Sequence, residues 1–162
     1  MTRVLVAYAT SRGGTQGLAE VIGESLHELG HDTVVREAAE VTELADADAV
    51  VVAGPLYAGT WHKDARRFVS RHADWLREMP VWLVATGPLD GSAAEREIPP
   101  VPHVRAASAK IGARGVQTFG GRLLPDAKGL VASAMAKRSA GDWRDAEHVE
   151  RWAHEVDAQL RG

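Results

Sequence analysis

Short apolar runs rich in β-branched residues alternate along this chain with segments of helical periodicity. The runs occupy residues 4–8, 33–35, 49–53, 81–85 and 116–119. Continuous apolar runs of this length are typical of strands buried on both faces of a sheet. Because a helical segment follows most of the runs, the pattern predicts an α/β fold with a parallel sheet and right-handed crossovers.

The helical segments lie between these runs and after the last one. They occupy residues 15–29, 62–77, 104–111 and 146–160, and Gly30 and the pair Gly54-Pro55 are expected to end a helix and the third strand. Five strands suggest the doubly wound order 2-1-3-4-5. In such sheets ligands bind beyond the carboxyl ends of the strands, beside the first strand. The loops expected there cover residues 10–15, 55–62 and 86–91.

Composition limits the class of protein. The chain has 162 residues, 45% hydrophobic and 25% charged, which predicts one globular domain over residues 1–162. A net charge of −3 does not indicate the positively charged surface that nucleic-acid binding requires. There is no cysteine, the seven histidines form no metal-binding motif, and no apolar run approaches the roughly 18 residues of a membrane span. We expect a cytoplasmic protein without a metal.

The first loop, in the stretch "YATSRGGTQG", has the composition of an anion site. Free N–H groups and the helix dipole favour negative charge at a helix start, and glycines allow close approach of a ligand. The hydroxyl and glycine residues concerned are Thr10, Ser11, Gly13, Gly14 and Thr15. The alternative is an ordinary capped helix start. Dinucleotide and nucleoside triphosphate motifs are absent, so a mononucleotide phosphate suits this loop better.

The second and third loops could hold a planar ring. Tyr57 and Trp61 flank Ala58-Gly59, which would bring aromatic faces and bare backbone together. Alternatively, an aromatic of this loop packs the loop onto the helix below. The third loop, "TGPLDG", offers backbone donors and acceptors with little side-chain bulk.

Taken in order, these stretches resemble the flavodoxin superfamily, and more closely the actinobacterial flavodoxin-domain proteins related to menaquinone-dependent protoporphyrinogen dehydrogenases. The matching stretches are "VLVAYATSRGGTQGLAEVI", "VVVAGPLYAGTWHKDARRFV", "VWLVATGPLD", "GARGVQTFGGRL" and "GDWRDAEHVERWAHEV". They span almost the whole chain, and their order and spacing carry the resemblance.

The resemblance implies bound flavin mononucleotide (FMN), with its phosphate in the first loop and its ring between the second and third loops. The peptide at Gly59 would approach the reactive N5 of the ring. The residues implied in cofactor binding are Thr10, Ser11, Arg12, Gly13, Gly14, Thr15, Pro55, Leu56, Tyr57, Ala58, Gly59, Trp61, Thr86, Gly87, Pro88 and Asp90.

Three functions are compatible with these features. The leading interpretation is an FMN-dependent oxidoreductase that passes electrons or hydride to a small acceptor such as a quinone or porphyrinogen. A flavodoxin-type carrier serving a redox protein is the second, although −3 is weakly acidic for a carrier. A flavin-free binding protein is the third, because common flavodoxins have Thr or Ser at Arg12 and Asn or Ser at Gly14. Arg12 could pair with the phosphate or extend into water.

Two further features have alternative roles. His62, at the mouth of the second loop by the resemblance, is either a weak candidate for protonating a substrate or a solvated histidine at a helix start. The segment 122–138 mixes leucines with basic residues. It could serve as a substrate lid, a homodimer surface or a site of peripheral membrane contact.

Overall fold

The computed structural model describes residues 2–10, 14–44, 46–57, 60–86, 102–119 and 143–161. Its main sheet consists of parallel strands in the order β2-β1-β3-β5-β6. These strands are β1 (Arg3–Tyr8), β2 (Asp32–Glu37), β3 (Ala49–Tyr57), β5 (Val81–Thr86) and β6 (Gly115–Phe119). A short strand, β4 (Thr60–Trp61), pairs antiparallel with the end of β3. With β4 set aside, this is the predicted order 2-1-3-4-5.

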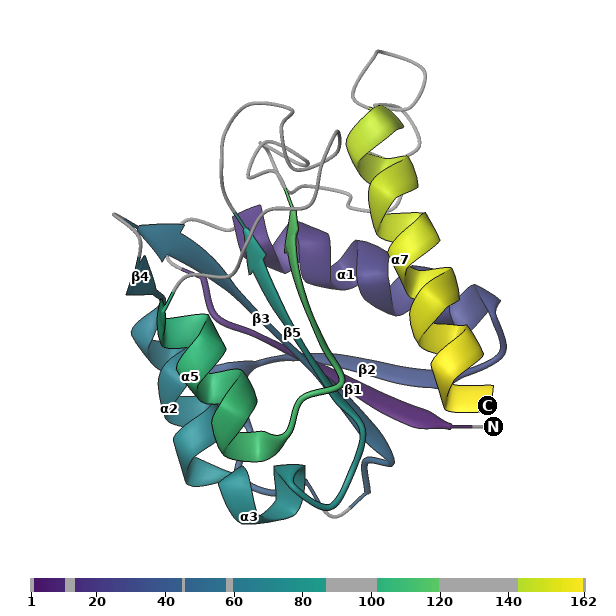
Figure 1. Ribbon diagram of the computed structural model, residues 1–162. Coiled ribbons are helices and arrows are strands. Elements are labelled where there is room, and N and C mark those ends of the chain that lie inside the picture. Colours follow the sequence, from purple (N-terminus) through teal and green to yellow (C-terminus); the bar gives the residue numbers. More distant parts are fainter. Residues whose placement is uncertain are drawn as a thin grey trace.

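Helices cover both faces of the sheet (Figure 1). One face carries α1 (Gly14–Glu28) and α7 (Trp143–Arg161), and the other carries α2 (Lys63–Arg71), α3 (Ala73–Leu76) and α5 (Pro102–Ile111). A 3-10 turn, η1 (Ala38–Glu40), follows β2. Within the described part of the chain, no helix is long and apolar enough to cross a membrane.

Alternate residues of the central strands enter two separate cores. Val4 and Val6 of β1 pack with α1 and α7, whereas Leu5 and Ala7 pack with the helices of the opposite face. Every residue of β5 is buried. This burial on both sides explains why the strands have continuous apolar sequences.

Two predicted boundaries are wrong. Gly54-Pro55 does not end the third strand, because β3 continues to Tyr57. β3 pairs with β1 only as far as Ala53. Proline has no N–H to donate, and at position 55 there is no longer a neighbouring residue of β1 that would require one. The helix predicted over residues 62–77 is divided at His72, whose φ of −106° and ψ of 15° separate α2 from α3.

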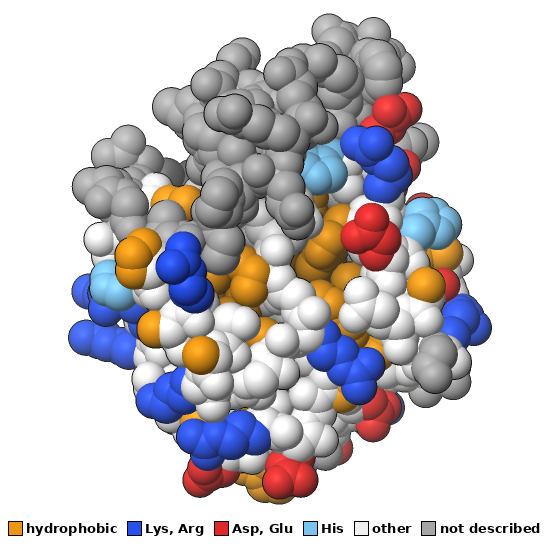
Figure 2. All heavy atoms as spheres, viewed as in Figure 1, with side chains coloured by type: hydrophobic (Ala, Val, Ile, Leu, Met, Phe, Trp, Pro, Cys, Tyr) orange, Lys and Arg blue, Asp and Glu red, His pale blue; other side chains and the backbone are white. Residues whose placement is uncertain are grey.

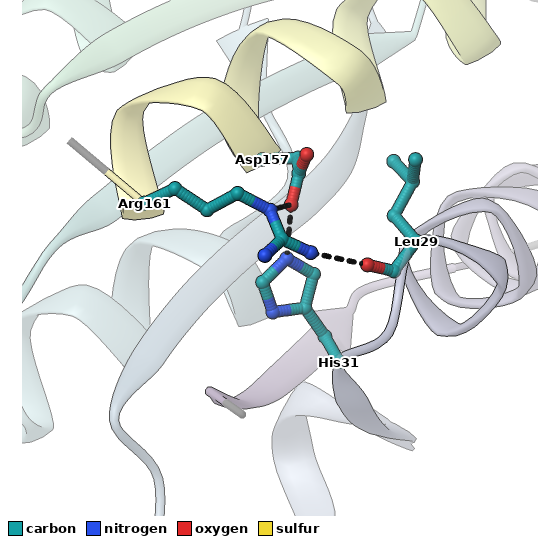
Figure 3. Close-up of polar contacts among 4 residues, drawn as sticks. All are labelled: Leu29, His31, Asp157 and Arg161. Carbon is teal, nitrogen blue, oxygen red and sulfur yellow. Dashed lines mark hydrogen bonds and ion pairs between the residues drawn. The ribbon is translucent and has the colours of Figure 1, made fainter.

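A polar cluster fastens α7 to the turn after α1 (Figure 3). One carboxylate oxygen of Asp157 lies 2.7 Å from His31 Nε2 and accepts a 2.7 Å hydrogen bond from Arg161 Nε. Arg161 also donates to the Leu29 carbonyl. Burial raises the pKa of the Asp157 carboxyl, but hydrogen bonds from His31 and Arg161 outweigh it and hold that pKa below its usual value.

Replacing Asp157 with Ala should lower the free energy of unfolding at pH 7 by about 1.5–3 kcal/mol, the range for hydrogen bonds to charged groups. The lowered pKa means that the stabilisation is present above roughly pH 4 and disappears as the pH falls through the folded-state pKa. Urea unfolding of both proteins should therefore give a difference that narrows in acid.

Asp74→Ala is the matched control. Asp74 also pairs with an arginine at 2.7 Å, but its side chain is 96% exposed, so its loss should change stability little. Equal losses in the two variants, or a difference for Asp157→Ala that does not depend on pH, would contradict the assigned role of the cluster.

Candidate functional site

The candidate site lies at the carboxyl edge of the sheet, where the strand order reverses. From β1 the chain crosses to β2 on one side, and β3 lies on the other. The three predicted loops follow β1, β3 and β5, which are neighbours and run parallel. Their carboxyl ends therefore meet at one edge, which is the usual ligand position in doubly wound sheets.

Two predicted site residues far apart in sequence are brought together here. Thr15, in the first turn of α1, and Thr86, the last residue of β5, place their hydroxyl oxygens 3.2 Å apart, and both residues are buried. The contact fixes the start of α1 against the end of β5. At the same edge, the Ala9 amide donates a 2.8 Å hydrogen bond to the Ala53 carbonyl, which continues the pairing of β1 with β3.

The start of α1 has the electrostatics of an anion site. The helix begins at Gly14, and its first turn contains no acidic side chain. The first N–H groups of a helix lack partners within it, and they carry the positive end of the dipole. No carboxylate of that turn competes with an anion for these groups.

Trp61 is completely buried. Its Nε1 donates a 3.1 Å hydrogen bond to the Gly54 carbonyl, and its own carbonyl accepts one from Arg66 Nε. A Cβ at position 54 would lie 3.0 Å from Trp61 Nε1 and from Ala65 Cβ, so glycine is needed for this close approach. The geometry favours the packing alternative for Trp61 over stacking on a ligand.

His62 is the N-cap residue that precedes α2, and its side chain is mostly buried. Its Nδ1 accepts a 3.0 Å hydrogen bond from the Asp64 amide, and its own amide donates to the Pro55 carbonyl. Its side chain is 9% exposed, so it is a helix cap and not the solvated histidine that one alternative expected. Together with Trp61, it holds the turn from β3 through β4 into α2.

Tyr8, the last residue of β1, lies at the same edge of the sheet and is buried in the core with α1. Burial, reinforced by Glu37, Glu20 and Glu40, raises the pKa of the Tyr8 phenol.

The remaining predicted residues divide into two groups. Pro55, Leu56 and Tyr57 lie in β3, Gly14 starts α1, and Thr10 follows β1, half-buried and with a polar partner. Outside the described residues lie Ser11, Arg12, Gly13, Ala58, Gly59, Gly87, Pro88, Asp90 and the segment 122–138.

Trp61→Phe should lower the free energy of unfolding by about 1–3 kcal/mol, because the buried Gly54 carbonyl would lose its donor. Trp75→Phe is the control, since Trp75 is 55% exposed. Urea unfolding would contradict the packing role if the two substitutions had equally small effects.

Comparison with known proteins agrees with this geometry. A family model described as flavodoxin domain matches residues 5–139. Among proteins of curated function, no sequence is significantly similar.

Several solved flavodoxins have similar structures over nearly the whole chain. That of Streptococcus pneumoniae TIGR4 is 21% identical, with 97% of this chain and 99% of the other covered and a TM-score of 0.64. A single-site mutant of a flavodoxin from Pseudomonas aeruginosa is 16% identical, with 99% of each chain covered and a TM-score of 0.65. A flavodoxin from the domain Archaea is 15% identical, with 99% of each chain covered and a TM-score of 0.67. The sequence match and the observed fold together place the chain in the flavodoxin domain family.

Proposed function

We propose that this protein binds FMN at the carboxyl edge of β1 and β3 and acts as a redox flavoprotein. The observation that carries the proposal is the start of α1. It lies at the point where the strand order reverses, without an acidic side chain in its first turn, and is fixed by the contact between Thr15 and Thr86. Such a helix start suits a phosphate, which FMN has and a free flavin ring lacks.

The loops after β1, β3 and β5 would divide the cofactor between them. Residues 10–15 would hold the phosphate, and the ring would lie between residues 55–59 and residues 86–90. Tyr57 is the aromatic left for contact with the ring, because Trp61 is buried in the protein core. Bound flavin supplies one- and two-electron transfer, while the protein binds, orients and shields it.

In finer terms, we propose an oxidoreductase of the protoporphyrinogen dehydrogenase-related type, acting on a small acceptor such as a quinone or porphyrinogen. The stretches that resemble those enzymes and the small net charge of −3 support this. The alternatives are a carrier that serves a redox protein and a flavin-free binding protein.

The phosphate assignment predicts that the apoprotein binds FMN more tightly than riboflavin. Gln16→Glu would place a carboxylate in the first turn of α1, where it suits the helix but opposes a phosphate. FMN affinity should fall by roughly two- to fivefold, with little change for riboflavin. Fluorescence titration of the apoprotein with both ligands measures this.

Gln16→Ala is the control, because it removes the hydrogen bond from Gln16 to Glu20 without adding charge. Equal affinity of the wild type for FMN and riboflavin would contradict the phosphate assignment.

The small-acceptor proposal predicts direct reaction with a quinone. Stopped-flow mixing of the reduced holoprotein with a menaquinone analogue should show reoxidation faster than that of free reduced FMN, because a bound flavin is positioned for its acceptor. A rate no greater than that of free FMN would exclude the quinone as acceptor and favour the carrier alternative.

A further inference from the structure

The exposed side of α2 is strongly basic. Lys63, Arg66, Arg67 and Arg71 are all exposed, and with Ser70 they line a surface hollow of about 560 Å³. Figure 2 shows Lys and Arg side chains gathered over α2 and α5. The opposite side of α2 is buried in the core through Ala65, Phe68 and Val69. The basic side is therefore the one that α2 presents to solvent.

The cations of this face are not neutralised within the described part of the chain. None of the four basic residues of α2 forms an ion pair there, and Arg66 Nε is bonded to a backbone carbonyl. The one acidic residue of α2 is Asp64, which lies beside His62 in the first turn. Lys110 of α5 extends the face, with its Nζ 3.5 Å from Ser70 Oγ.

This arrangement does not favour helix stability. Lys63, Arg67 and Arg71 are spaced four residues apart, and like charges at this spacing destabilise a helix. The protein as a whole carries a charge of −3, so the rest of the chain is more acidic than the total suggests. A concentrated positive face on an acidic protein orients an approaching partner through its electrostatic field.

We propose that the basic face of α2, with the adjoining end of α5, is the docking surface for an acidic redox protein. Three of the four cations of α2 are arginines, and the exposed Trp75 lies on the following helix, α3. Arginine and tryptophan are enriched at the energetic centres of protein interfaces.

One end of the basic face lies next to the candidate site. Lys63 follows His62 directly, and His62 ends the turn that borders the candidate site. A protein bound along α2 would therefore lie beside that site. That the partner carries a redox centre, as the donor of the electrons that the flavin passes to its small acceptor, rests on the proposed function, whereas its acidity rests on the charges of α2.

The test measures docking and does not need flavin. A fluorescently labelled, acidic plant-type ferredoxin is titrated with the protein at low and high salt, and binding is followed by anisotropy. The wild type should bind at low salt and weaken as salt screens the contact. Arg67→Glu should weaken binding on the order of tenfold, because it reverses a charge at the centre of the face.

Arg151→Glu is the matched control. Arg151 is also exposed, and its helix, α7, covers the opposite face of the sheet, so binding should stay within about twofold of wild type. Arg67→Glu should also keep or raise the melting temperature, because its carboxylate would lie four residues from both Lys63 and Arg71. Weaker docking in a protein of equal or greater stability separates an interface role from a folding defect.

Three results would overturn the inference. They are equal weakening by Arg67→Glu and Arg151→Glu, absence of ferredoxin binding to the wild type, and binding through Arg67 to phosphatidylglycerol vesicles or single-stranded RNA but not to ferredoxin. If the protein fails to bind FMN while docking depends on Arg67, the proposed function fails and the acidic-protein interface stands. If FMN binds and ferredoxin does not, the docking surface is contradicted and the proposed function stands.

Discussion

Burial of the central strands on both faces is the constraint on which this structure depends. Side chains of β1, β3 and β5 alternate between two cores, and each core needs its own layer of helices. Strands that are covered on both sides are joined by crossovers and run parallel. Their carboxyl ends consequently share one edge, and the strand order reverses between β1 and β3, which is where doubly wound sheets usually bind ligands.

Around that edge, local contacts fix the elements that a ligand would meet. The contact between Thr15 and Thr86 ties the first turn of α1 to β5, and the indole of Trp61 ties the turn after β3 to Gly54. His62 then caps α2, which places a row of cations immediately beyond the site. The structure thus combines a helix start without acidic side chains in its first turn and an exposed row of cations along α2.

The sequence predicted the elements well where the pattern was continuous. The five apolar runs correspond to the strands of the main sheet, because strands buried on both faces consist almost entirely of apolar residues. It could not predict that β3 passes through Pro55, which depends on where the neighbouring strand ends. Nor could it choose between packing and stacking for Trp61, because burial of that side chain depends on tertiary contacts such as the hydrogen bond to the Gly54 carbonyl. A net charge of −3 concealed the basic face of α2, because the sum contains no information about position.

The central claim is that the edge between β1 and β3 is an FMN site. The most direct measurement is the visible absorption spectrum of the purified protein after incubation with excess FMN and gel filtration, with the mass of the released ligand determined by mass spectrometry. The account predicts a flavin spectrum in near-stoichiometric amount and the mass of FMN. A colourless protein, or one that releases a flavin without phosphate, would contradict it.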